Sequence, residues 1–276
     1  MSPPLAEPSA RIVFNSIEAE DPGYLILNFS LEAENPVPSA GKAKIGSWRV
    51  ELNGQRAGTG FSLDTPGGDI FPVKAASEPG ENADSLSGSA SFPLRLNMDL
   101  ASLAGAGLAP ADDYKLNLVM ELSFIFDSEP PARIEVSGLA AFPGLRPPVF
   151  NITSIAILKA ELINTRFRVG LKIDNPNPFP LELSAFSYEL YGNGRIWADG
   201  QERNVLKVNG KSSLQGNLFL LMNFINMKRD LLDQVINLED VNYRFSGDAL
   251  VISGVEYLPQ FKTSFNLSGY SPVLDN

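Results

Sequence analysis

The chain has 276 residues, of which 44% are hydrophobic, and a formal net charge of −10. It contains no cysteine and no histidine, which excludes disulfides, thiolate metal sites, the usual zinc centres and serine–histidine catalysis. Because a common domain has about 100–150 residues, the length predicts two domains that fold without covalent staples.

The charge is divided unevenly between the two halves. Residues 1–145 carry 9 Lys and Arg against 19 Asp and Glu, whereas residues 146–276 carry 13 of each kind. The acidic first half argues against nucleic acid or an anionic membrane surface as a partner, since both require clusters of Lys and Arg. Solubility alone is a sufficient explanation of this acidity.

Alternating apolar residues predict strands along much of the chain. In chain order these strands cover residues 25–31, 114–126, 167–173, 243–252 and 261–267. The pairs Asn53-Gly54 and Asn193-Gly194 predict tight hairpins, because both residue types tolerate the positive φ angles of such turns. Short strands with frequent turns are typical of β-sandwiches.

Three segments depart from the strand pattern. Residues 64–85 are rich in acidic residues, proline and glycine, which predicts a long solvated insertion in the first half. Residues 226–237 have helical apolar spacing with Leu231 on the apolar face. Residues 99–103 carry a poorer helix signal, which Gly105 should end.

Four landmarks recur in the same order in the two halves, which predicts tandem copies of one β-rich unit. The predicted domains are residues 10–142 and 149–272. The paired landmarks are residues 34–36 with 174–176, 48–54 with 186–192, 58–60 with 198–200, and 136–139 with 267–270.

The strongest landmark is an Asn-Pro motif that follows a predicted strand in each half. Proline forces an extended conformation on the preceding residue and lacks the N–H that a ladder needs, so the motif predicts a defined strand exit. Asparagine amides in such a segment can bond to nearby backbone groups, whereas a ligand-binding loop is the functional alternative. The motif residues are Asn35 and Pro36 in the first half and Asn175, Pro176, Asn177 and Pro178 in the second.

No segment has the pattern of a phosphate-binding loop, a nucleophile elbow or a calcium loop. We therefore expect no catalytic residues, no cofactor and no metal. A ligand surface would need an apolar pocket or an aromatic platform, and exposure of Trp197 and Tyr191 would favour one. The candidate surface residues are Trp48, Tyr188, Tyr191 and Trp197.

Residues 150–270 resemble the late embryogenesis abundant type 2 family, also called the WHy (water stress and hypersensitive response) domain. The resemblance rests on residues 160–162, 169–180, 188–194 and 198–200, in that order, and residues 11–140 show it more weakly. It implies two tandem fibronectin-III- or immunoglobulin-like antiparallel β-sandwiches, each with about one short helix. It also implies a role in desiccation and stress tolerance without enzymatic activity.

We expect a non-catalytic tandem module with a stress-protective, structural or interaction role. Its partner would be an unknown protein or a cell-envelope component. The expected location is the bacterial periplasm or cell surface after removal of a leader, with the cytoplasm as the alternative. No segment reaches the about 18 apolar residues of a membrane span, so the membrane attachment that we consider is a lipid anchor upstream. The alternative function is an envelope protein that binds carbohydrate or lipid.

Overall fold

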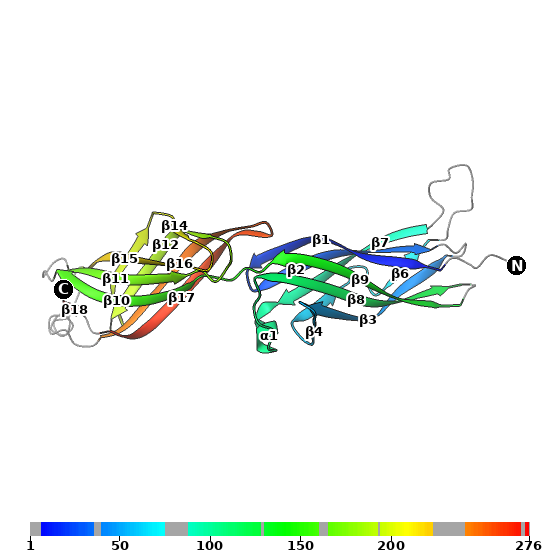
Figure 1. Ribbon diagram of the computed structural model, residues 1–276, viewed down its shortest axis with the longest axis horizontal. Helices are drawn as coiled ribbons and strands as arrows, with labels where there is room; N and C mark the ends of the chain where they lie inside the picture. The colour runs from blue at the N-terminus through cyan, green and yellow to red at the C-terminus, as the bar shows by residue number, and fades with distance from the viewer. Residues whose placement is uncertain are drawn as a thin grey trace. The chain divides into compact units, whose positions relative to one another are not determined.

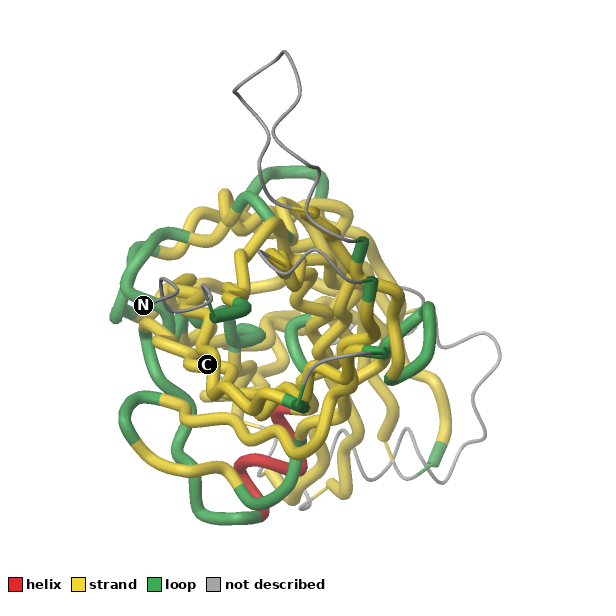
Figure 2. The backbone as a smooth tube through the Cα atoms, turned by 90° about the vertical axis from the view of Figure 1, so that its right-hand side faces the viewer, coloured by secondary structure: helices red, strands yellow, loops and turns green. Residues whose placement is uncertain are grey.

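The computed structural model describes residues 7–35, 40–74, 88–127, 130–159, 165–192, 194–222, 241–271 and 274–275. The chain divides into two compact units, residues 1–144 and 145–276. Strands dominate both units, and the described residues contain one helix, α1 (Leu100–Gly105) in the first unit (Figures 1 and 2). The predicted mainly β fold with antiparallel sheets is confirmed.

The first unit contains two antiparallel sheets. One has the order β1-β2-β7-β5, and the other has the order β4-β3-β8-β9 with β6 also paired to β3. The strands of the first sheet are β1 (Ser9–Asp21), β2 (Tyr24–Asn35), β7 (Gly88–Asp99) and β5 (Phe61–Asp64). Those of the second are β4 (Gln55–Ala57), β3 (Gly41–Leu52), β8 (Asp113–Phe126), β9 (Ala132–Pro143) and β6 (Ile70–Val73).

The core of the first unit follows from the alternation along its central strands. Every second residue of a strand points to the same face, and burial in β2 and β8 alternates accordingly. Burying one face of each sheet is how two sheets form a sandwich. The buried residues include Leu25, Leu27, Phe29 and Leu31 of β2 and Leu116, Leu118, Met120, Leu122 and Phe124 of β8.

The second unit also contains two sheets. Their orders are β15-β11-β10-β18 and β13-β12-β16-β17, with β14 also paired to β12. The strands of the first sheet are β15 (Ser213–Met222), β11 (Thr165–Asp174), β10 (Val149–Lys159) and β18 (Leu274–Asp275). Those of the second are β13 (Arg195–Glu202), β12 (Leu181–Gly192), β16 (Val241–Val255), β17 (Leu258–Ser271) and β14 (Leu206–Val208).

The two units share one strand order over most of their length. The series β1-β2-β7 corresponds to β10-β11-β15, and β4-β3-β8-β9 corresponds to β13-β12-β16-β17. The short strands β6 and β14 each pair with the strand that follows the Asn-containing loop. The units differ at the ends of their first sheets, where β5 adjoins β7 and β18 adjoins β10.

One predicted landmark pairing was wrong by two residues. The β3–β4 ladder closes with Leu52 opposite Gln55, and the β12–β13 ladder closes with Gly192 opposite Arg195. Leu52, at the end of its ladder, therefore corresponds to Gly192, not to Leu190. A shift of two residues keeps every side chain on its original face, so the alternation of apolar residues cannot reveal it.

The structure contradicts part of the predicted insertion and contains one of the two predicted helices. Residues 64–85 were expected to be a solvated insertion, but they include β6, whose Phe71 and Val73 are buried at 3% and 1% exposure. The weaker helix signal corresponds to α1, which Asp99 caps by accepting hydrogen bonds from two backbone amides. The helix predicted over residues 226–237 lies outside the described residues.

Candidate functional site

The Asn-Pro motif of the second unit forms a buried amide cluster between β11 and β12. Asn175 and Asn177 are 3% and 0% exposed. The Nδ2 group of Asn175 donates to the carbonyls of Phe179, Val208 and Asn209 at 2.8, 3.1 and 3.1 Å. Its Oδ1 atom accepts from the backbone and side-chain nitrogens of Asn177, both at 2.9 Å.

Asn177 extends this cluster to the first residues of the unit. Its Nδ2 group donates to the carbonyl of Arg146 and its Oδ1 atom accepts from the Arg146 amide, both at 2.8 Å. The carbonyl of Pro176 accepts from the side chains of Arg146 and Lys211, at 2.5 and 2.9 Å. The motif therefore fixes three segments that are far apart in the sequence.

The first unit has a buried asparagine at the corresponding position. Asn35 ends β2 at 0% exposure, and its Nδ2 group donates to the carbonyl of Lys74 at 3.0 Å. Lys74 directly follows β6, just as Asn209 directly follows β14. Pro36, the second predicted motif residue of this half, lies outside the described residues.

The geometry favours a structural role for the motif. Both amides of the second unit direct their hydrogens at protein acceptors, and both carbonyl oxygens accept from protein donors. Buried polar groups are costly unless they are paired in this way. No polar atom of the two amides is left to bind a ligand.

Two of the four candidate aromatic residues are core residues, which corrects their assignment to a ligand surface. Trp197 is 4% exposed and its ring stacks on that of Phe167, with centroids 5.5 Å apart. Tyr188 is 8% exposed, and its ring packs at 5.8 Å from that of Phe245. Alternation placed both side chains on strands, but it did not decide which face was buried.

The other two aromatic residues lie nearer the surface, one in each unit. Tyr191 is half-buried, donates to Glu189 at 2.8 Å and lies 4.0 Å below the guanidinium of Arg244. Trp48 belongs to the first unit, is 37% exposed and lines a hollow of about 210 Å³ together with Arg56.

A larger hollow of about 390 Å³ lies over a row of glycines and rings in the second unit. Gly200, Tyr188, Gly247 and Phe265 are direct neighbours across β13, β12, β16 and β17. A Cβ on Gly200 would lie 2.6 Å from Tyr188, and one on Gly247 would lie 2.5 Å from Phe265. The two aromatic rings therefore cover the adjacent glycines.

The side chains around this hollow are acidic. Its lining includes Glu189, Asp199 and Asp248, and Asp248 accepts from Ser264 at 2.6 Å. Burial, together with nearby Glu202 and Asp199, raises the pKa of Tyr188 above its usual value. The hollow suits a hydroxyl-rich or cationic group. However, no group of three or more acidic side chains in the described ranges is arranged to hold a metal ion.

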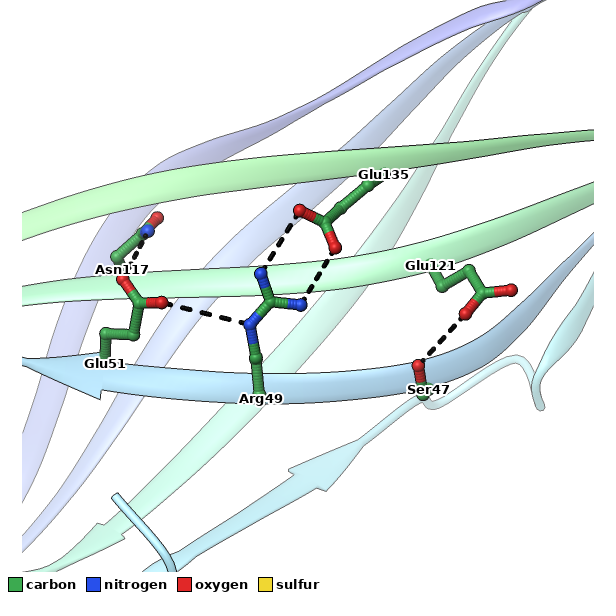
Figure 3. A network of polar contacts seen from close by, with 6 residues as sticks. All are labelled: Ser47, Arg49, Glu51, Asn117, Glu121 and Glu135. Atoms are coloured by element: carbon green, nitrogen blue, oxygen red, sulfur yellow. Dashed lines mark hydrogen bonds and ion pairs between the residues drawn. The ribbon is translucent and has the colours of Figure 1, made fainter. Parts of the chain in front are cut away.

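The most connected surface network lies on β3, β8 and β9 of the first unit (Figure 3). Arg49 donates to both oxygens of Glu135, at 2.9 and 3.1 Å, and lies 3.9 Å from Glu51. The Arg49 hydrogen bonds lower the pKa of Glu135, and Glu135 in turn raises the pKa of Arg49. This network ties three strands together and neutralises a cation that could otherwise bind an anion.

Sequence reasoning missed the partners of these groups. Arg146 stands before two prolines, and nothing in that stretch indicates that its backbone pairs with Asn177. The pairing of Arg49 with Glu135 joins residues 86 positions apart, so it has no local signal. In the parts of the chain that the structure describes, no helix has both the length and the apolar character of a membrane span.

Comparison with protein families finds one match. Residues 170–257 match the model of the family described as late embryogenesis abundant protein. The matched stretch lies within the second unit, covers less than half of the chain and includes the amide cluster. No match was found among curated proteins.

Several solved structures are similar to the chain at low identity. A protein from Archaeoglobus fulgidus is 20% identical, with 45% of this chain and 97% of that chain covered and a TM-score of 0.27. The periplasmic chaperone SfaE is 12% identical, with 97% and 100% covered and a TM-score of 0.25. A glycosyl hydrolase family 2 member from Bacteroides cellulosilyticus is 8% identical, with 87% and 28% covered and a TM-score of 0.28. Similarity at this level carries no argument about function.

Proposed function

We propose that this chain is a non-catalytic, tandem β-sandwich protein of the late embryogenesis abundant type 2 (WHy) class. Its two units descend from one ancestral sandwich and act together as a folded stress-protective module. The module presents sheet surface to a protein or cell-envelope component. Its proposed location is the bacterial periplasm or cell surface.

The amide cluster at Asn175 and Asn177 is the observation that carries this proposal. The family match includes both residues, and the cluster holds the loop that the resemblance rests on. The common strand order of the two units supports a tandem origin. The match to the family supports a non-catalytic protein at the level of the family.

The alternative, an envelope protein that binds carbohydrate or lipid, has less support. Such a site needs an apolar pocket or stacked aromatic rings. Trp197 and Tyr188 are buried in the second unit, which leaves Tyr191 as its remaining candidate, with Trp48 on the other unit. The hollow near Tyr188 is polar and acidic, unlike a lipid site.

A drying assay tests the proposed protective role. A desiccation-sensitive enzyme is dried and rehydrated with an equal mass of this chain, of albumin or of an Asn175→Ala variant. We expect the native chain to preserve more enzyme activity than albumin does, and the variant to protect less because its second unit is destabilised. Equal protection by the chain and albumin would refute the protective role.

The proposed location has a separate test. Fractionation of the source cells, followed by mass spectrometry of the mature N-terminus, should find the chain in the periplasm or at the surface. Recovery with the cytoplasmic proteins would contradict the location but leave the protective role intact.

A further inference from the structure

The two units differ at one edge of the sandwich. In the first unit, β5 lies along the outer edge of β7, with Phe61 opposite Met98 and Asp64 opposite Arg95. In the second unit, the corresponding strand β15 ends its sheet, and β11 is its one ladder partner among the described residues (Figure 1). An open edge strand presents unpaired backbone groups that can pair with another chain.

The cause lies in the strand before this edge. In the first unit, β4 has 3 residues, after which the chain turns at residues 58–60 and joins the other sheet as β5. In the second unit, β13 has 8 residues and stays beside β12. The segment that would pair with β15 is therefore used in the opposite sheet, from which β13 and β14 still contact β15.

Two outward-facing side chains of β15 are apolar where the corresponding side chains of β7 are polar. Leu94 and Leu96 face Phe29 and Leu27 on β2, just as Leu218 and Leu220 face Val169 and Phe167 on β11. Arg95 and Asn97 of β7 therefore correspond to Phe219 and Leu221 of β15. The first two are polar, and Asn97 bonds to Ser62 of β5 at 3.2 Å. Phe219 and Leu221, by contrast, are 65% and 59% exposed.

A basic pair lies beside these apolar side chains. Arg168 is directly opposite Phe219, and Arg166 is directly opposite Leu221. Neither arginine forms an ion pair with any residue in the described ranges. The outer face at this end of the sheet thus combines two exposed apolar residues with two available cations.

The inner side of the edge also has space. The residue opposite Leu171 on β15 is Gly216, and a Cβ there would meet nothing within 4 Å. The corresponding residue of the first unit is Phe92, whose ring stacks on Phe71 with centroids 4.1 Å apart. A strand added to β15 can therefore place a side chain in the space beside Gly216, which no side chain of Gly216 fills.

We propose that the outer edge of β15 binds an extended segment of a partner protein as an antiparallel added strand. The partner segment carries apolar side chains opposite Phe219 and Leu221 and acidic side chains at the flanking positions. Strands lie about 4.8 Å apart, so a glutamate on the added strand and an arginine on β11 can meet across β15. Backbone hydrogen bonds supply the affinity and the side chains supply the selection, as in other cases of strand addition.

Binding of a designed peptide to the full chain tests this proposal. The probe is a capped peptide of sequence ETVTVTE, which places glutamate and valine on one face of a strand. Amide NMR shifts should change along Ser213–Met222 and the neighbouring part of β11. Charge reversal to KTVTVTK, or proline at the central position (ETVPVTE), should weaken binding at least tenfold.

Matched variants locate the site. Phe219→Ser with Leu221→Ser, and separately Arg166→Glu with Arg168→Glu, should each weaken binding at least tenfold without changing the circular dichroism spectrum. Tyr270→Ser is the control, because Tyr270 is 77% exposed on β17 of the other sheet, and it should bind like the native chain.

Four results would overturn the proposal. These are shift changes away from β15, equal binding of the two charged peptides, and slow hydrogen exchange of all β15 amides in the free chain. The fourth is concentration-dependent dimerisation that is lost in the Phe219→Ser, Leu221→Ser variant, which would assign the edge to a second copy of this chain.

Discussion

In the first unit the chain leaves its second sheet after the 3 residues of β4, whereas in the second unit β13 continues for 8 residues. Both units keep the same central strands. The two units share the order of their corresponding strands. They differ in the segment after β3 or β12: in the first unit it crosses to the other sheet as β5, and in the second it stays beside β12 as β13. Among the described residues, one unit thereby pairs an edge strand that in the other unit has no second ladder partner.

The largest expected effect is the loss in free energy of unfolding when the buried asparagine of a unit is replaced. Asn175→Ala leaves three carbonyls, the backbone N–H of Asn177 and one N–H of its side chain without the Asn175 amide as partner. Since each buried unsatisfied group costs about 1–3 kcal/mol, we expect a loss of about 4 kcal/mol. Asn35→Ala should also destabilise the first unit, because it leaves the carbonyl of Lys74 without its partner. Fluorescence of Trp197 in a Trp48→Phe background reports on the second unit, and hydrogen exchange of β2 reports on the first.

The control for this comparison is Asn266→Ala on the exposed face of β17. It should change the free energy of unfolding by less than about 0.5 kcal/mol. A loss below about 0.5 kcal/mol for Asn35→Ala or Asn175→Ala would show that the buried amide does not stabilise its unit.

Helix packing gives the next largest effect. Leu103 of α1 is 2% exposed and lies over Gly60, so Leu103→Ala should cost the first unit about 2–3 kcal/mol. Leu231→Ala should cost the second unit about 2–5 kcal/mol if the helix predicted at residues 226–237 packs similarly. Urea unfolding measures both. A loss below about 0.5 kcal/mol would identify Leu231 as a surface residue.

The turn that redirects the chain predicts a smaller effect. Gly60 has a φ angle of 83°, and a Cβ there would lie 2.7 Å from Leu103. Gly60→Ala should therefore destabilise the first unit by about 1–3 kcal/mol. Gly58→Ala is the matched variant, because a Cβ there meets nothing within 4 Å. Identical thermal midpoints for the two variants would contradict this account of the turn.

The smallest expected effect is on how the stability of each unit falls at acid pH. Arg49 lowers the pKa of Glu135 in the first unit, and Lys172 together with Ser213 lowers that of Asp174 in the second. A lowered pKa in the folded state contributes stability above the unfolded pKa, and this contribution is lost as the pH falls through the folded pKa. Glu135→Gln should weaken the acid dependence of the first unit alone, and Asp174→Asn that of the second. Acid titrations followed by hydrogen exchange distinguish the units, and a change in both from one substitution would contradict this assignment.

The sequence predicted the features whose signals are local. Alternation of period two located β2, β8 and β11, and the Asn-Pro motif located the amide cluster. It missed β6, because Pro72 and the surrounding glycines hide a strand that is held by its pairing with β3. It also could not place Trp197 inside, because burial depends on the facing ring of Phe167. The sequence analysis did not predict the long-range contacts, because these join residues that are far apart in the sequence.

The row of Gly200, Tyr188, Gly247 and Phe265 has a consequence for the way this fold diverges. Each glycine is small because the ring beside it occupies the space of its missing side chain. At Gly247 a Cβ would also collide with the backbone carbonyl of Ser187, so a smaller residue at Phe265 would not make room for it. The three atoms nearest to a Cβ on Gly200 all belong to the Tyr188 side chain. In an alignment of relatives, we therefore expect Gly200 and Tyr188 to covary, whereas Gly247 should remain glycine whatever stands at Phe265.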